Sequence, residues 1–334
     1  MEPSEKLRLF GVEDDGQDGL PIALMVGFMS RLYAVHTRAR VLRFSQPDSM
    51  PYTPILSQSI DEPRKVFERV VKAIYDARPR YEIVRFGPLD PESSLFHDLL
   101  RTLRDAGQIV QTFHVFTNRY EIITGRTSEE YFRARPSALR NTLRRQGKKL
   151  DASGNSRFEL VTGGATLDRS IADFDHVFAA SWKEGEQLVS VQYLHSIMKC
   201  AAEADALRLG LIYLDNEPAA AQFWIVSKRA AYCYRLAYNK KYRKLSIGSI
   251  LTQRIIEHVI EVDGVNIIDL GIGDDHYKKD WASKYRERFG IAAFNPRTVR
   301  GLRSMVRHVG GRAVKRSIMR PLRALANLVS YRNS

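Results

Sequence analysis

A run of basic and small residues at positions 239–249, with the sequence NKKYRKLSIGS, has the composition of an anion-binding loop. Small residues let a backbone approach a ligand, and the first N–H groups of a following helix point outward and favour negative charge. The side chains of Arg243 and Lys244 would add mobile positive charge. We therefore predict a pyrophosphate site formed by Arg243, Lys244, Ser246, Ile247, Gly248 and Ser249. The alternative is an ordinary helix start that Ser246 caps.

A glycine-broken stretch, Gly271-Ile272-Gly273-Asp274-Asp275-His276-Tyr277-Lys278, is the second candidate site. Open sheets bind ligands at the carboxyl ends of their strands, so charged groups that follow a strand are placed to act on a substrate. Asp269 is a candidate general base, because burial raises the pKa of a carboxyl group towards neutral pH. Asp274 is the rival base, unless it caps the helix that follows. Lys278 could neutralise developing charge or bind an acceptor.

Three further side chains are candidates for an acceptor site. Gln222 is polar within an apolar run and is either a contact for the acceptor or a hydrogen-bonded buried amide. Tyr234, in a predicted strand, either projects towards a small substrate or packs. Trp281 either walls the acceptor pocket or belongs to the core. The eight histidines form no ligand set, so we predict no metal and no tightly bound cofactor.

Hydrophobic periodicity predicts the elements that position these residues. Two runs rich in β-branched and aromatic residues, 221–226 and 230–238, flank a turn-prone Ser227-Lys228-Arg229 and predict a hairpin. A short buried strand is expected over 266–270, with a second helix after the glycines. A helix is expected directly after the anion-binding loop, with one buried face formed by Ile250, Leu251, Ile255, Ile256, Val259 and Ile260.

The motif Arg243-x-x-Ser246-x-Gly248 resembles the pyrophosphate loop of the GNAT acyltransferases, [Q/R]-x-x-G-x-[G/A], with serine at the first glycine position. The runs YRLAYNKKYRKLSIGSIL and DLGIGDDHYKKDW look like the cellulose-biosynthesis-type acetyltransferases of that superfamily. This branch is related to the Fem-type peptidoglycan aminoacyltransferases. The resemblance extends over residues 158–295 and, more loosely, over 20–150. Ile247 stands where the branch often has proline.

The resemblance implies an acyl-thioester donor, such as acetyl-CoA, and a small-molecule amine acceptor. Backbone groups of the strand before the loop would hold the acyl-pantetheine between Leu236 and Tyr238, and Tyr277 would protonate the leaving thiolate. It also implies an α/β (α+β) fold of tandem GNAT-like units, each a mixed, mostly antiparallel sheet flanked by helices. The association of the family with surface-polysaccharide biosynthesis makes an amino sugar the expected acceptor.

The chain of 334 residues is long enough for two medium domains. We expect a polar, flexible lead-in, an N-terminal GNAT-like unit that ends in a basic helix, a C-terminal acyltransferase domain and a basic tail, over residues 1–19, 20–150, 157–296 and 297–334. Within the N-terminal unit, strands and helices are expected in alternation, over 22–30, 33–44, 66–77, 81–86, 94–106, 109–117 and 119–124.

The formal net charge of +14 is concentrated in the tail, where nine arginines and one lysine contribute +10 without any acidic residue. A charge confined to one segment indicates a local role, so we expect no nucleic-acid partner. Val299, Leu302, Met305 and Val306 recur at three- and four-residue steps. The tail is therefore either a terminal helix packed on the enzyme or a basic amphipathic helix. The second would dock on an anionic membrane, which liposome binding at low salt would test, or on an acyl carrier protein.

The basic helix over 128–150 leaves rival functions open. Its charged residues are Arg140, Arg144, Arg145, Lys148 and Lys149. They either form a solvated face or bind an acyl carrier protein, a nucleotide or a tRNA. A tRNA contact would indicate a Fem-type aminoacyl transferase, and the third hypothesis is a non-catalytic nucleic-acid- or membrane-binding protein on a GNAT scaffold. Two cysteines and no long apolar run predict a cytoplasmic protein, peripheral to the inner face of the membrane if the tail docks there.

Overall fold

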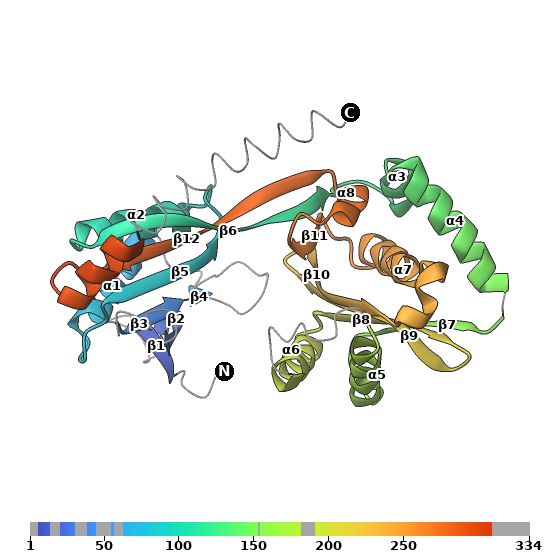
Figure 1. The fold of residues 1–334 in the computed structure, drawn as a ribbon, viewed down its shortest axis with the longest axis horizontal. Helices are drawn as coiled ribbons and strands as arrows, with labels where there is room; N and C mark the ends of the chain where they lie inside the picture. The colour runs from blue at the N-terminus through green and yellow to red at the C-terminus, as the bar shows by residue number, and fades with distance from the viewer. Residues whose placement is uncertain are drawn as a thin grey trace. The chain divides into compact units, whose positions relative to one another are not determined.

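The computed structural model describes a mixed α/β chain in two compact units, each a sheet flanked by helices (Figure 1). This confirms the predicted fold class. Among the described residues, unit 1 takes in those up to 115 and those from 287, and unit 2 takes in those from 116 to 286. The boundary falls inside two long strands, β6 (Ile109–Ile122) and β12 (Lys284–Phe294), which contribute to both units. The described residues are 6–13, 21–30, 39–44, 55–56, 63–152, 154–181 and 191–308.

Unit 1 has the strand order β1-β2-β3-β5-β12, with β4 paired to β2. The pairing of β3 with β5 is parallel, and those of β1 with β2, β2 with β3, and β5 with β12 are antiparallel. The apolar face of α1 is buried through Val66, Phe67, Val70, Val71 and Ile74, and the rings of Phe44 and Phe86 stack with centroids 4.7 Å apart. The elements are β1 (Lys6–Glu13), β2 (Pro21–Ser30), β3 (Val41–Phe44), β4 (Ile55–Leu56), α1 (Pro63–Asp76), β5 (Ile83–Leu89) and α2 (Ser94–Asp105).

Unit 2 has the strand order β6-β11-β10-β9-β8-β7, antiparallel except for β10 with β11. The predicted hairpin, helix and short strand are confirmed as β9, β10, α7 and β11. The elements are α3 (Ser128–Arg133), α4 (Ser137–Ala152), β7 (Ser156–Val161), α5 (Leu167–Ala179), α6 (Val191–Glu203), β8 (Leu207–Leu214), β9 (Glu217–Ser227), β10 (Ala230–Tyr238), the 3-10 helix η2 (Lys240–Leu245), α7 (Ile247–Glu261), β11 (Ile267–Ile272) and α8 (His276–Trp281).

Helices cover both faces of the central strands of unit 2, with α7 on one face and α5 and α6 on the other (Figure 1). Burial on both faces explains why β8 is buried along its whole length, including Arg208, which pairs with Asp263, since a strand with one wet face alternates instead. Gly210 lets α7 lie close to β8, because a Cβ atom there would stand 2.6 Å from Ile255 Cδ1. The helix that carries the predicted anion site is therefore fixed against the sheet.

Three predicted elements differ from the structure. The lead-in contains β1, which pairs with β2 through Lys6–Glu13, so this part of the segment is not a loose coil. The two strands expected over 109–117 and 119–124 are one strand, β6, because Asn118 continues the ladder and is buried. The strand expected over 33–44 is described only at its end, as β3; residues 33–38 lie outside the described part of the chain.

The basic helix that was assigned to the N-terminal unit packs with unit 2. Leu139 and Leu143 of α4 are buried in the same cluster as Ile250 and Leu251 of α7. At the other end, Ile291 and Ala293 of β12 belong to the core of unit 1. The boundaries expected at 150–157 and 296 divide the chain in sequence order. The two cores instead group residues whose apolar faces pack together, so α4 belongs to unit 2 and part of β12 to unit 1.

The described part of the tail is a helix over 299–308 that begins after Thr298, whose hydroxyl accepts a hydrogen bond from Gly301 N–H at 3.1 Å. Met305 packs against a small apolar cluster of unit 1, whereas Val299, Leu302 and Val306 are exposed. Residues 309–334, which carry the rest of the predicted tail, lie outside the described part. Its membrane or carrier contact stays a prediction. Among the described helices, none is long and apolar enough to cross a bilayer.

A buried carboxylate joins three elements of unit 2. Glu121, on β6, accepts hydrogen bonds from Ser283 N–H and Oγ, both at 2.7 Å, and from Arg135 at 3.2 Å. Arg135 and Tyr131 also donate to the carbonyl oxygen of Trp281, at 2.9 and 2.6 Å. Burial alone would raise the pKa of Glu121, but the hydrogen bonds from Ser283 and Arg135 together outweigh it and hold the pKa below its ordinary value. This junction fixes the end of α8 against β6 and α3.

We expect Glu121→Gln to lower the free energy of unfolding by about 3 kcal/mol at neutral pH, because Arg135 loses its buried partner. The folded-state pKa of Glu121 is lowered, so its contribution is complete above about pH 4.5 and is lost as the pH falls through the folded-state value. Urea denaturation at neutral and acidic pH measures both effects. A difference between variant and wild type that persists undiminished in acid would contradict this assignment.

Candidate functional site

The parallel strands β10 and β11 separate soon after they start. They pair at three positions, which are Ala230 with Ile267, Ala231 with Ile268 and Tyr232 with Asp269. Beyond Tyr232, β10 remains paired with β9 as far as Tyr238, and no further pairing with β11 is present in the described sheet. Along Leu236–Tyr238, the edge of β10 away from β9 therefore presents backbone N–H and C=O groups that can bind an extended ligand.

Asp269 holds the bend that separates the two strands. Its buried carboxylate accepts hydrogen bonds from Asn118 Nδ2 at 2.8 Å, from Gly271 N–H at 2.8 Å and from Arg286 Nη2 at 2.5 Å. Gly271 has a φ of +71°, and the pairing of β11 with β6 shifts register between Asp269 and Ile272. With its oxygens occupied in this way, Asp269 fits a structural role better than that of a general base.

In the predicted anion loop, the residue directly before α7 has a left-handed backbone conformation. Ser246 has φ +52° and ψ +33°, and its side chain makes no capping hydrogen bond to α7. Its carbonyl oxygen accepts from the N–H groups of Ser249 and Ile250, at 2.9 and 3.1 Å. The N–H groups of Ile247 and Gly248 find no acceptor among the described residues. The alternative of a side-chain cap by Ser246 is therefore wrong, and two donors at the helix start are available to an anion.

Two contacts fix the first turn of α7 against the hairpin. Gln222 is fully buried: its amide donates to the carbonyl oxygen of Gly248 at 3.0 Å and to Thr252 Oγ1 at 2.7 Å, and its oxygen accepts from Trp224 Nε1 at 2.9 Å. The Tyr238 ring lies close to Gly248: a Cβ atom at position 248 would stand 3.0 Å from that ring, so a larger residue would be crowded there. Gln222 is thus a satisfied amide that positions the loop.

The remaining residues of the predicted donor site surround this turn. Ile247 is buried in the core of unit 2, and Leu236 and Tyr238 of β10 pack partly buried against it. Arg243 and Lys244 are exposed at the end of η2. The carbonyl oxygen of Lys244 accepts from Gln146 of α4 at 3.3 Å, a contact that was not predicted. The side chains of Arg140, Arg144, Arg145, Lys148 and Lys149 on α4 are all exposed.

Tyr277 lies beside Cys233, just beyond the last pair of β10 with β11. Burial raises the pKa of its phenol well above the ordinary value, and the neighbouring Cys233 thiol and Asp275 carboxylate act in the same direction. Cys233 is the first residue of β10 beyond the last pair with β11. The phenol is therefore protonated at neutral pH and can donate a hydrogen bond, and 43% of the residue is exposed.

The two other charged candidates are bound to protein groups. Lys278 is buried, and its ammonium group donates to the carbonyl oxygen of Ile272 and lies 3.5 Å from Asp275. Asp274 forms an ion pair with Arg119 at 2.5 Å, and this bond is the main reason that the pKa of Asp274 is lowered. Lys278 thus fastens the glycine loop, and Asp274 is exposed but a weak base.

Tyr234 and Trp281 both pack in the interior, which was the predicted alternative to a role in the acceptor site. The Tyr234 ring is buried, with its centroid 5.1 Å from that of Phe223. Trp281 is buried in the core of unit 2 beside Phe132. The structure therefore brings together the loop, the open edge of β10 and Tyr277, and assigns Gln222, Tyr234 and Trp281 to the support of that site.

Residues 137–279 match a family model described as an acetyltransferase (GNAT) domain. This part of the chain is a GNAT-family domain. The matched region begins at the first residue of α4 and ends inside α8, so it contains α4, the loop and the glycine stretch. No curated protein matches the chain.

Two solved structures share the fold over most of the chain. FemX superposes with a TM-score of 0.61 at 11% identity, covering 87% of this chain and 88% of its own. L-PGS from Bacillus licheniformis superposes with a TM-score of 0.56 at 14% identity, covering 92% of this chain and 89% of its own. Both alignments extend well beyond the matched GNAT domain, so unit 1 belongs to the shared fold. At these identities, the similarity is evidence for the fold alone.

We expect Asp269→Asn to lower the free energy of unfolding by about 3 kcal/mol, because the substitution leaves Arg286 without its charged partner. Asp274→Asn is the matched control and should unfold close to the wild-type denaturant midpoint, because its carboxylate is exposed. Urea denaturation compares the two. An Asp269→Asn protein that keeps the wild-type midpoint but loses turnover would show that Asp269 is the general base instead.

Proposed function

We propose that the protein is an N-acyltransferase that moves an acetyl or other acyl group from a thioester, such as acetyl-CoA, to an amine. The single observation that carries the proposal is the edge of β10 at Leu236–Tyr238, which is not paired with β11 in the described sheet. It leads to the first turn of α7, where the N–H groups of Ile247 and Gly248 have no acceptor among the described residues. An extended thioester with a pyrophosphate at its far end matches these features. The acceptor is proposed to be an amino sugar, by association with the matched family alone.

The chemistry requires few protein groups. The amine attacks the thioester carbonyl, the C–S bond breaks, and the thiolate takes a proton. Tyr277 is the proposed donor of that proton or hydrogen bond, since its phenol is neutral and stands beside the opening. Asp274 is the remaining carboxylate candidate for accepting the amine proton, because Asp269 is occupied by Asn118, Gly271 and Arg286.

The alternative is an aminoacyl transferase whose donor is a charged tRNA. The exposed basic face of α4 favours it, because that helix touches the loop through Gln146 and Lys244. A tRNA contact would make donor binding fall steeply with salt, whereas a CoA contact involves few phosphates. Measuring donor binding to CoA and to tRNA at two salt concentrations separates the two functions.

We expect Gly248→Ala to raise the dissociation constant for CoA about tenfold or more, because the new Cβ displaces the Tyr238 ring and crowds the helix start. Arg243→Ala should weaken binding less and reduce its salt dependence. Calorimetry on folded protein measures both. Gly163→Ala is the matched control, since a Cβ there would make only an ordinary 3.6 Å contact with Ala202. Unchanged CoA affinity in Gly248→Ala would reject the loop as the donor site.

We expect Tyr277→Phe to lower kcat by about 100-fold while the dissociation constant for CoA changes little, because the phenol acts late, on the leaving thiolate. Single-turnover assays and calorimetry give the two quantities. Tyr285→Phe is the control, since Tyr285 is an exposed tyrosine of β12. Normal turnover of Tyr277→Phe under conditions where chemistry limits the rate would remove this role.

A further inference from the structure

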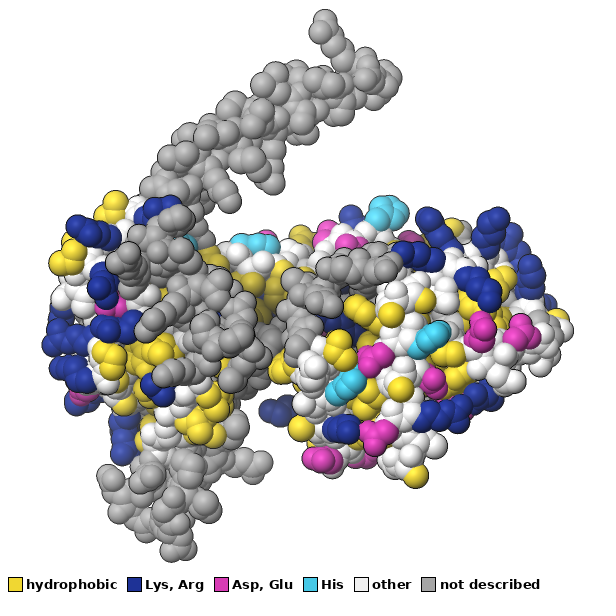
Figure 2. Space-filling view, turned by 60° about the horizontal axis from the view of Figure 1, so that its bottom comes forward, with side chains coloured by type: hydrophobic (Ala, Val, Ile, Leu, Met, Phe, Trp, Pro, Cys, Tyr) yellow, Lys and Arg dark blue, Asp and Glu magenta, His cyan; other side chains and the backbone are white. Residues whose placement is uncertain are grey.

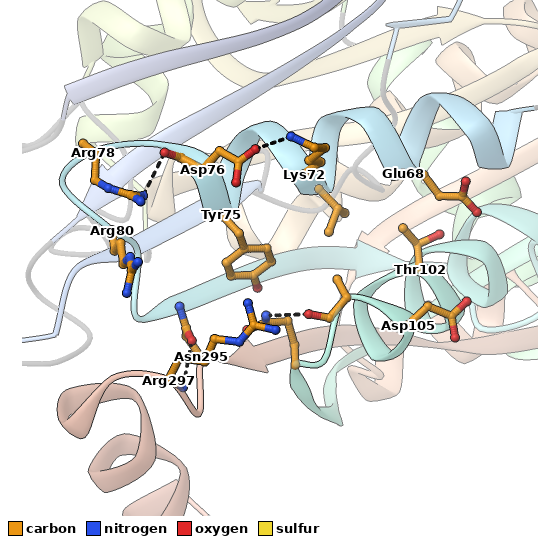
Figure 3. Close-up of a pocket in the computed structure, with 13 residues that line it drawn as sticks. Glu68, Lys72, Tyr75, Asp76, Arg78, Arg80, Thr102, Asp105, Asn295 and Arg297 are labelled. Atoms are coloured by element: carbon orange, nitrogen blue, oxygen red, sulfur yellow. Dashed lines mark hydrogen bonds and ion pairs between the residues drawn. The ribbon is translucent and has the colours of Figure 1, made fainter.

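Unit 1 contains a cavity of about 420 Å³ that the proposed reaction does not use. It lies where the ends of α1 and α2 approach the residues that follow β12, and every residue that lines it belongs to unit 1 (Figure 3). Its volume lies within the range of small-molecule sites in proteins. The cavity is therefore large enough for a metabolite of sugar-phosphate size.

Three buried polar atoms of the lining have no protein partner among the described residues. They are the Tyr75 hydroxyl, Thr102 Oγ1 and Gln108 Oε1. Thr102 is 2% exposed and Gln108 is 7% exposed, so both are buried groups. The Gln108 amide nitrogen donates to the carbonyl oxygen of Ala106 at 3.1 Å, so the acceptor end is the one left without a partner. Buried polar groups are nearly always hydrogen-bonded, which points to a polar occupant.

The carboxylates of the lining are already paired. Asp76 lies 2.5 Å from Lys72, and Glu68 and Asp105 lie 3.1 and 3.0 Å from two nitrogens of Arg64. None of these three is free to balance a further cation. Two cationic side chains, those of Lys72 and Arg64, thus balance most of the negative charge near the cavity.

The arginines of the lining are not paired in this way. No ion pair is present for Arg78, Arg80 or Arg297 in the described part of the chain, and Arg78 donates only to the carbonyl oxygens of Asp76 and Ala77. Figure 3 shows Arg78 and Arg80 at one side of the cavity and the Arg297 guanidinium below the Tyr75 ring. These three exposed guanidinium groups have no ion pair among the described residues and can therefore bind an anionic ligand.

We propose that this cavity binds a small phosphate ester that carries hydroxyl groups. A dianionic phosphate suits three guanidinium groups better than a single carboxylate does. Gln108 Oε1 can only accept, so the ligand must supply a donor there, as a sugar hydroxyl does. The Tyr75 and Thr102 hydroxyls can donate or accept, and burial raises the pKa of Tyr75 far enough to keep its phenol protonated. The proposal is independent of the acyltransferase reaction.

Calorimetry on the full chain tests this site, with hexose and triose phosphates as probes and with glucose and inorganic phosphate for comparison. At least one sugar phosphate should bind saturably, more tightly than inorganic phosphate, and glucose should not bind. Tyr75→Phe should weaken that binding about tenfold, the ratio that one hydrogen bond provides. Arg297→Ser should weaken it at least as much. Arg101→Ser, which removes an exposed arginine of α2 outside the cavity, should leave it unchanged.

Stability measurements separate lost binding from lost folding. Tyr75→Phe removes a hydroxyl without a partner, so its melting temperature without ligand should equal or exceed that of the wild type. Two results would overturn the proposal. One is the absence of saturable binding for every sugar phosphate at millimolar concentration, which would indicate a cavity filled by water. The other is equal affinity in the wild type and in Tyr75→Phe and Arg297→Ser, which would locate the binding elsewhere.

Discussion

The separation of β10 from β11 is the constraint on which the rest of unit 2 depends. Parallel strands normally remain paired along their shared length, because unpaired N–H and C=O groups lose hydrogen bonds. Here three pairs are followed by a bend, and Asp269 compensates by accepting the N–H of Gly271. Arg286 and Asn118 hold that carboxylate in turn. The opening in the sheet is thus held by a buried ionic group rather than by a flexible loop.

The opening has a rigid frame on each side. Gln222 joins β9 to the first turn of α7, and Gly248 lets the Tyr238 ring lie against the same turn. On the other side, Lys278 holds the glycine loop, and the Glu121 junction holds the end of α8. Rigid elements thus position the edge of β10.

Several basic residues also remain exposed on this unit and on the tail helix. Figure 2 shows Lys and Arg side chains spread over the visible face, with acidic side chains among them.

The hairpin, the helix after the loop and the buried face of α1 follow from periodicity, because apolar spacing encodes which face is covered. The role of Asp269 does not follow, because a buried base and a buried structural carboxylate have the same local sequence. What decides between them is Asn118, which lies 151 positions away, and Arg286, 17 positions away. Ser246 likewise looks like a cap, and only the structure shows that its side chain makes no capping hydrogen bond. The sequence does not predict the cavity of unit 1, because the residues that line it come from separate segments of the chain, from Glu68 to Arg297.

The two long strands that cross the unit boundary have a consequence for the order of folding. The core of unit 1 needs β12, which pairs with β5 through Ala292 with Arg85 and Ala293 with Val84, and all of unit 2 lies between them in the chain. During synthesis, the first half of the chain therefore cannot complete its sheet until the second half has been made. The contact is of long sequence separation, which slows folding and leaves the edge of β5 unpaired in the meantime. A nascent chain of this protein would accordingly need protection of that edge, and unit 2, whose strands are continuous in sequence from β6 to β11, is the part able to fold first.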